Sequence, residues 1–163
     1  HGRVEGQDVL LKTGKFLKSV LIEAGYKAVI PFLDEKFHHV ESHEEGYTSN
    51  WSERHVAYIC GLGTFGLSKS IITKAGSAGR LVSVVTDLVL PATPREYTEV
   101  YQYCTFCGAC VKRCPASAIS PEKGKEHQPC GDLVHHKRTD YPDYYGCGKC
   151  QIGMPCENGI PAK

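Results

Sequence analysis

The stretch Cys104-Thr-Phe-Cys107-Gly-Ala-Cys110-Val-Lys-Arg-Cys114-Pro115 places four cysteines within eleven residues and ends in a proline. This C-x2-C-x2-C-x3-C-P spacing lets three thiolates on one tight loop bind three iron corners of a cubic cluster. The fourth cysteine turns away before the proline and points toward a second cluster. The stretch therefore predicts iron–sulfur chemistry in this part of the chain.

A zinc site is the alternative for these four cysteines. Structural zinc takes four ligands, usually from two C-x2-C pairs that lie some way apart in the sequence. Four cysteines in eleven residues, closed by a proline, fit that pattern poorly. We therefore favour iron–sulfur over zinc for this motif.

Four more cysteines follow in a looser arrangement and complete the set that two clusters need. They are Cys130, Cys147, Cys150 and Cys156. Two [4Fe–4S] cubes need eight thiolates, and the crossed arrangement exchanges one ligand between motifs. We assign Cys104, Cys107, Cys110 and Cys156 to cluster 1, and Cys114, Cys130, Cys147 and Cys150 to cluster 2. A free thiol is the alternative for Cys130, and it would leave cluster 2 one ligand short.

The ninth cysteine, Cys60, stands apart from the others, after the apolar run 56–59. We expect it to be a buried structural thiol. A disulfide framework is disfavoured for the whole set, because nine is odd and the spacing is too tight for a secreted scaffold.

The totals exclude several classes of function. The chain has 163 residues and a formal net charge of +1, so no excess of basic charge indicates a nucleic-acid partner. No apolar run is long enough to span a bilayer, and no signal peptide is visible, so we expect a cytoplasmic protein. Because Met154 is the only methionine, His1 is not a natural start, and we expect the chain to be the C-terminal part of something longer, with processing as the alternative.

Apolar spacing and turn residues predict the elements that precede the cysteines. We expect a helix at 8–24, a strand at 26–32, a loop at 34–50, a helix at 50–60 opened by Asn50, a glycine-rich turn at 61–66, a helix at 67–74 and a strand at 80–90. A short strand at 56–60 is the alternative for the second helix. The predicted class is α+β: a partial α/β domain at 1–96, then a loop-rich ferredoxin-like module with two [4Fe–4S] clusters at 97–163.

Two features together resemble a known group of enzymes. One is the turn Ala57-Tyr-Ile-Cys-Gly61-Leu-Gly63-Thr-Phe-Gly66, which leads on to the apolar stretch 84–90, and the other is the cysteine set with its lone Cys130. The sequence resembles epoxyqueuosine reductases and, more distantly, corrinoid-dependent reductive dehalogenases, over about residues 52–161. The resemblance implies that two clusters pass electrons to a cobalamin, with Gly61, Gly63 and Gly66 at the corrinoid. It also implies that residues 1–96 end a larger corrinoid-holding domain.

The sequence departs from the family pattern at two places. Five residues separate Cys150 from Cys156, where the family usually has three and a proline after the last cysteine. Tyr47 stands near the position of the family's catalytic carboxylate. Because the dehalogenases use a tyrosine as proton donor, the resemblance makes Tyr47 the candidate catalytic residue. A surface tyrosine in a polar loop is the alternative.

Two weaker patterns have other interpretations. The glycines at 61, 63 and 66, with Asp87 further on, match the dinucleotide-binding fingerprint, but that fingerprint needs a strand before it and a full helix after it. His39 and His43 would share one face of a helix and suggest a metal site, whereas their acidic neighbours favour a solvated polar loop.

We therefore predict an oxidoreductase that relays single electrons through two [4Fe–4S] clusters to a reductase site. The expected partners are an electron-donor protein of ferredoxin or flavodoxin type and a small-molecule substrate, with no membrane. Lys112 and Arg113 lie beside the first motif and offset cluster charge or dock an acidic donor. The alternative is a ferredoxin-like carrier with no active site of its own.

Overall fold

The computed structural model describes residues 2–42, 46–144 and 146–162, with the backbone alone at 41, 42, 46 and 47. The fold is α+β with small antiparallel sheets, as predicted. The chain forms two compact units, His1–Val56 with Arg80–Ala92, and Ala57–Gly79 with Thr93–Lys163. The expected division near residue 96 differs from these units and stays a prediction about domains.

The first unit contains the long helix α1 (Glu5–Glu23), which confirms the helix predicted at 8–24. Acidic Glu5 and Asp8 lie in its first turn, where their negative charges interact favourably with the positive end of the helix dipole. Gly14 is the buried residue of this helix, and a Cβ there would lie 3.1 Å from a methyl group of Val82. The absence of a side chain at Gly14 thus lets segment 80–84 pack closely on the helix.

A two-residue ladder joins β1 (Ala28–Val29) to β6 (Val85–Thr86) in antiparallel register. Lys27 extends it by donating its backbone N–H to the Asp87 carboxylate at 2.8 Å. A short 3-10 turn, η1 (Pro31–Leu33), follows β1. The predictions of longer strands at 26–32 and 80–90 are therefore wrong in extent. Val89 is 92% exposed, so the apolar residues after β6 gain no burial that would extend the strand.

The segment predicted as a loop at 34–50 contains a hairpin instead. Its strands are β2 (His39–Ser42) and β3 (Gly46–Ser49), paired with His39 opposite Ser49. Asn50 closes the open end of the hairpin, because it accepts from the His38 N–H at 3.1 Å and donates to the Lys36 carbonyl at 2.8 Å. The Asn50 side chain is thus used by the hairpin rather than by the helix that follows.

Helix α2 (Glu53–Ile59) confirms the predicted second helix, so the alternative of a strand at 56–60 is wrong. The next element is a hairpin of β4 (Gly63–Phe65) and β5 (Ile71–Thr73), and the helix predicted at 67–74 is therefore also wrong. A Cβ at Gly63 would lie 2.1 Å from the Ile72 carbonyl oxygen, so only glycine allows the two strands to pair here.

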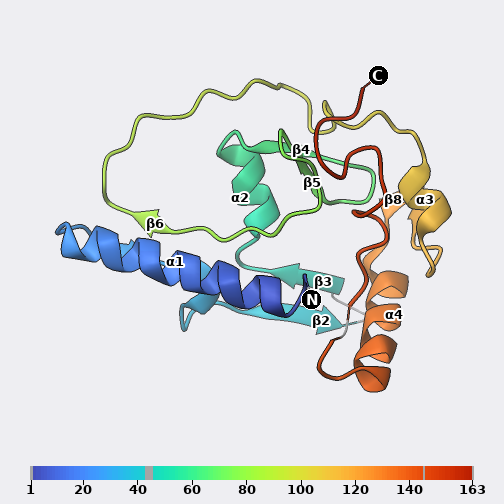
Figure 1. Ribbon diagram of the computed structural model, residues 1–163, viewed down its shortest axis with the longest axis horizontal. Coiled ribbons are helices and arrows are strands. Elements are labelled where there is room, and N and C mark those ends of the chain that lie inside the picture. The colour runs from blue at the N-terminus through green and yellow to red at the C-terminus, as the bar shows by residue number, and fades with distance from the viewer. Residues whose placement is uncertain (1, 43–45, 145, 163) are drawn as a thin grey trace. The chain divides into compact units, whose positions relative to one another are not determined.

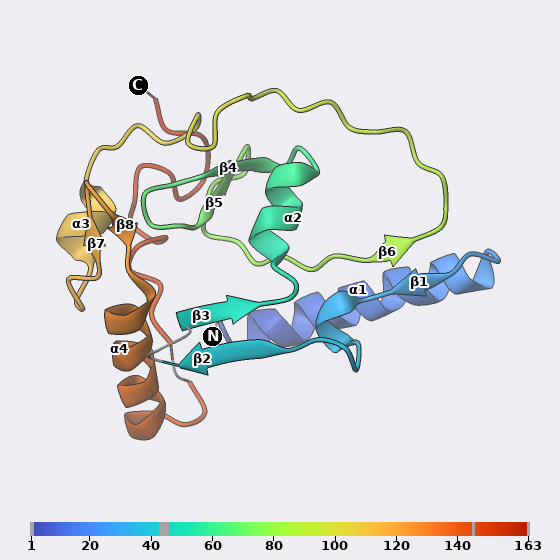
Figure 2. The ribbon, with the colours of Figure 1, turned by 180° about the vertical axis from the view of Figure 1, so that it is seen from behind.

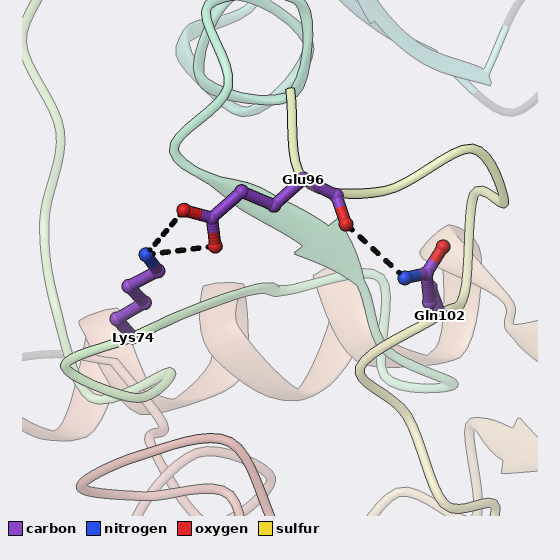
Figure 3. Close-up of polar contacts among 3 residues, drawn as sticks. All are labelled: Lys74, Glu96 and Gln102. Atoms are coloured by element: carbon purple, nitrogen blue, oxygen red, sulfur yellow. Dashed lines mark hydrogen bonds and ion pairs between the residues drawn. The ribbon is translucent and has the colours of Figure 1, made fainter. Parts of the chain in front are cut away.

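The hairpin β4–β5 is fastened to the segment that leads into the cysteines, within the second unit. Phe65 donates its backbone N–H to Val100, and buried Thr64 accepts from the Tyr103 N–H at 2.9 Å. Figure 3 shows Lys74 bound to both carboxylate oxygens of Glu96, whose carbonyl accepts from Gln102. These contacts explain why residues 57–79 belong to the same unit as the cysteines.

Apart from the helix α4, the cysteine-rich part is made of short elements and irregular connections (Figures 1 and 2). Helix α3 (Ala109–Arg113) is followed by the ladder of β7 (Ile119–Ser120) and β8 (Gly124–Lys125), and then by α4 (His127–Asp140). Ala118, Ile119 and Met154 are buried and supply its small apolar core. In the described part of the chain, no helix has the length and apolar character needed to cross a membrane.

Candidate metal centre

A cavity in the second unit, partly open to solvent, is lined by thiols from both cysteine motifs. Cys104, Cys107 and Cys110 contribute from the first motif, and Cys150 and Cys156 from the second. Most of the other lining side chains are apolar: Leu67, Ile72, Phe106, Met154, Pro155 and Pro161. The structure thus brings together the four cysteines that the sequence assigned to cluster 1.

Left-handed backbone conformations turn the first motif around this cavity. Phe106 has φ of 52° and Gly108 has φ of 72°, on either side of Cys107. A Cβ at Gly108 would meet nothing within 4 Å, so glycine is favoured there by conformation and not by space. Helix α3 begins immediately afterwards, and Cys110 lies in its first turn. The loop and the helix start therefore fix three thiols around one space.

The electrostatics of this thiol group favour the binding of a positively charged metal centre. Burial, followed by the neighbouring Cys104 and Cys107, raises the pKa of Cys110 to about 11. The Cys110 thiol in this apolar cavity thus resists ionisation. A bound metal centre reverses that preference, because it stabilises the thiolate directly. The donor set is the one that iron–sulfur clusters use.

A second group of thiols gathers around Cys150. Burial is the main cause that raises the pKa of Cys150, Lys125 opposes it, and Cys130 and Cys147 raise it further. Cys130 is carried by α4, and Cys147 lies in the loop after it. These three cysteines are members of the set that the sequence assigned to cluster 2. Cys150 also lines the first cavity, so the two groups are neighbours.

Cys114, the fourth cysteine of the first motif, lies at the end of α3. Its Sγ accepts the backbone N–H of Ala118 at 3.3 Å, across the turn that contains Pro115. Of the cysteines in its own motif, it is the one that does not line the cavity among the described residues. Whether Cys114 binds cluster 2 stays a prediction.

The described thiols surround a space and do not converge on one point. Among described residues, no three histidine, cysteine, aspartate or glutamate side chains gather closely enough to hold a single metal ion. The cavity is lined by thiols and apolar side chains, and one of its lining cysteines, Cys107, is exposed. These residues fit a [4Fe–4S] cluster, which needs cysteine sulfurs at its corners and an apolar surrounding.

The structure corrects two interpretations of the segment before the cysteines. Cys60 is exposed, so the prediction of a buried structural thiol is wrong. It follows the last residue of α2, where the apolar run 56–59 offers no cover for its side chain. The glycines at 61, 63 and 66 follow a helix and enter a β-hairpin, which is opposite to the strand–turn–helix order of a dinucleotide site.

Each of the three glycines has a local structural reason. Gly61 has φ of 83°, Gly63 permits the hairpin, and a Cβ at Gly66 would lie 3.1 Å from the Ile72 side chain. Gly66 also lines the thiol cavity. The backbone conformation and packing within the second unit are enough to explain these glycines. A corrinoid contact at them stays a prediction.

Tyr47 lies in β3, paired with Glu41 of β2, and its side chain falls outside the described residues. His43 also falls outside them. His39 lies on a strand and stacks on Phe37 with ring centroids 6.0 Å apart, so the helix face that the metal site would need is absent at His39.

Ser77 was missed by the sequence analysis, although its hydroxyl lies 3.5 Å from the Cys156 Sγ. This contact joins residues 79 positions apart, so no local spacing signals it.

Comparison with known proteins is consistent with these thiol groups. Residues 98–120 match the 4Fe-4S binding domain. The chain is 38% identical to a tetrachloroethene reductive dehalogenase of Desulfitobacterium hafniense over 114 residues, which is 64% of this chain and 20% of that protein. It is 31% identical to an epoxyqueuosine reductase of Francisella cf. novicida (strain Fx1) over 123 residues, 67% of this chain and 33% of that protein.

The chain thus spans about a fifth to a third of the curated relatives that it matches. No solved structure matches it. The resemblance to both groups of reductases is confirmed, and the domain match with these relatives supports an iron–sulfur redox role.

Proposed function

Starting from this relationship to iron–sulfur reductases, we propose that the chain is an electron-relay part of a reductase. It binds two [4Fe–4S] clusters and passes single electrons to a reductase site. The observation that carries the proposal is the cavity lined by Cys104, Cys107, Cys110 and Cys156, with Cys150 joining it to the second thiol group.

The residues around the cavity have distinct roles in this proposal. The four cysteine sulfurs of each set hold one cluster, and a bound cluster accepts and releases one electron at a time. Ile72 and Met154, both buried, exclude water from one side of cluster 1. Exposed Cys107 marks the side where an electron enters or leaves. The shared lining at Cys150 favours transfer between the two clusters.

The electron acceptor is proposed from the relatives and not from the cavity. In the resembling families the acceptor is a corrinoid, and Tyr47 is the proposed proton donor to a small-molecule substrate. The names of two relatives specify tetrachloroethene and epoxyqueuosine as what those proteins reduce. For this chain we propose reductive chemistry on a small molecule, with the proton supplied at the Tyr47 hydroxyl.

The electron donor is proposed to be an acidic protein of ferredoxin or flavodoxin type, in the cytoplasm. Lys112 and Arg113 form the last turn of α3, and Lys149 lies between two cysteines of the second motif. All three side chains are exposed beside the thiol groups. Exposed positive charge next to a redox centre attracts and orients an acidic partner.

A carrier that only shuttles electrons is the second candidate. It is favoured by the second unit, which contains both thiol groups in one compact body. A carrier and a reductase differ in whether a substrate-reducing cofactor is present, so the same purification can distinguish them.

The experiment is anaerobic purification of the full-length protein, followed by iron, sulfide and zinc analysis and an absorption spectrum. About eight iron and about eight sulfide per chain are expected for two cubes. Corrinoid bands beside the broad iron–sulfur absorbance support the reductase, and their absence supports the carrier. Stoichiometric zinc without sulfide contradicts both.

A further inference from the structure

Ser77 places a buried hydroxyl against one of the cavity thiols. Ser77 is 2% exposed, and its Oγ lies 3.5 Å from the Sγ of Cys156. Ser77 comes from the segment after β5, whereas Cys156 belongs to the last cysteine motif. The contact therefore joins a cysteine of the cavity to a residue outside both motifs.

The backbone holds this contact in place from both sides. The Ser77 N–H is shared between the carbonyls of Cys156 at 2.8 Å and Glu157 at 3.1 Å, and its own carbonyl accepts from the Gln151 amide at 2.9 Å. The preceding Gly76 has φ of 92°, and a Cβ there would lie 2.0 Å from the Glu157 carbonyl oxygen. The turn at Gly76 is thus shaped to bring Ser77 against Cys156.

The chemistry of a ligated cysteine fixes the direction of the hydrogen bond. A thiolate has no proton to give, so the Ser77 hydroxyl must be the donor when Cys156 binds iron. Donation to a ligand sulfur stabilises negative charge on the cluster. The reduced cluster carries more negative charge than the oxidised one, so it is stabilised more, and the reduction potential rises.

We infer that Ser77 is a positioning residue that raises the reduction potential of the cluster bound through Cys156. This inference rests on the proposed function, because it requires that a cluster is bound. Ser77 touches the ligand and not the cluster, so it acts through Cys156.

A comparison with Cys114, whose sulfur also accepts a hydrogen bond, shows how Ser77 differs. Cys114 accepts from the backbone N–H of Ala118, and no side-chain substitution removes that donor. At Cys156 the donor is a side chain, so one substitution alters the electronic environment of one cluster while every ligand is kept. A substitution at Ser77 is thus expected to change the reduction potential of one cluster and to leave that of the other cluster unchanged.

The test is a redox titration of the full-length protein, followed by electron paramagnetic resonance, with the iron content measured on each sample. Ser77→Ala removes the hydroxyl. Ser77→Thr and Ser77→Val are a matched pair of nearly equal shape, with and without a hydroxyl. Ser70→Ala is the control, because Ser70 is a buried serine of the same hairpin region whose hydroxyl bonds to Ser68 at 2.5 Å.

We expect Ser77→Ala and Ser77→Val to shift one potential to a more negative value. Ser77→Thr and Ser70→Ala should stay near the wild-type value, and the second cluster should not shift in any variant. Equal potentials in the Thr and Val variants, or a shift of both clusters, would overturn the inference. A wild-type protein that lacks iron and sulfide would overturn the proposed function instead, so the two failures can be told apart.

Discussion

The guanidinium group of Arg113 covers Gly153, so that a Cβ built on Gly153 would lie 3.1 Å from the nearest guanidinium nitrogen. Arg113 ends α3 in the first cysteine motif, and Gly153 lies in the loop between Cys150 and Cys156. The Glu157 carboxylate accepts the Gly153 N–H at 2.6 Å. The five residues between Cys150 and Cys156 therefore form a turn at Gly153, and the side chain of Arg113, from the first motif, packs against this turn.

The substitution Gly153→Ala tests this support. Gly153 has φ of 70°, a conformation that costs an L-residue about 1–2 kcal/mol. We expect the free energy of unfolding to fall by about that amount, and iron to be lost faster to a chelator, because the turn orients Cys156. Gly159→Ala is the matched control, since the nearest atom to its Cβ would be 3.8 Å away. Equal loss of iron in both variants would contradict the role of the turn.

The cysteine set predicts a specific change in iron content. Replacing Cys107 with serine removes a proposed ligand of cluster 1, and we expect iron to fall from about eight to about four per chain. The control is Cys60→Ser, because Cys60 is exposed and stands outside both motifs. The measurement is iron and sulfide per protein after anaerobic purification. Loss of iron in the Cys60 variant would show that the ligand set is misassigned.

The proposed ligand crossing would make the two motifs one folding unit, and it gives a prediction for Cys114. Because Cys114 is the cysteine of its motif that does not line the first cavity among described residues, Cys114→Ser should disturb cluster 2 and leave cluster 1. Electron paramagnetic resonance of the reduced protein should lose the spin–spin coupling between neighbouring clusters. Cys156→Ser is the counterpart and should disturb cluster 1. If the Cys114 variant loses cluster 1 instead, each motif binds its own cube.

The exposed lysines beside the thiol groups are expected to increase the rate at which an acidic donor protein reduces the clusters. Replacing Lys112 and Lys149 together with glutamate should slow reduction by an acidic ferredoxin or flavodoxin roughly tenfold at low ionic strength. The difference should shrink as salt screens the charges. Lys12→Glu, an exposed position on α1 in the other unit, is the control. Stopped-flow measurement of cluster reduction gives the rates, and equal slowing by the control would exclude a specific docking surface.

The resemblance to dehalogenases predicts that a substitution at Tyr47 slows product formation without affecting reduction of the clusters. Tyr47→Phe removes the proposed proton donor, so single-turnover product formation should fall at least about a hundredfold. Reduction of the clusters should be unchanged, since Tyr47 is no proposed ligand. Tyr26→Phe, which replaces an exposed tyrosine of the same unit, should behave as wild type. Normal product formation by Tyr47→Phe would remove the residue from the proposed mechanism.

The sequence predicted those elements and motifs whose pattern lies within one short segment of the chain. The amphipathic pattern of α1 and the spacing of the first cysteine motif each occupy one short segment, and both were interpreted correctly as a helix and a 4Fe-4S motif. The structure places Cys156 at the cavity of the first motif, together with Cys150. The assignment of Cys156 to cluster 1 and of Cys150 to cluster 2 stays a prediction from the spacing rules.

The errors have tertiary causes. The segment 67–74 was expected to be helical, yet β-branched Ile71 and Ile72 are buried in a strand, where close pairing with Gly63 decides the conformation. Helix α4 was not predicted, because none of its described residues is buried and its sequence therefore carries no apolar stripe. The Ser77 contact had no sequence signal, since a hairpin outside the motifs delivers it.

The shared cavity also has a consequence for how the protein is made. The first cysteine of its lining is Cys104 and the last is Cys156, which lies 52 positions later (156 minus 104). At typical rates of synthesis, the ribosome needs roughly 3–10 seconds to add that many residues. During this interval the first three thiols have emerged without their fourth ligand. Iron delivery is therefore expected after translation of the last motif, and until then the first three thiols are open to reaction with oxygen.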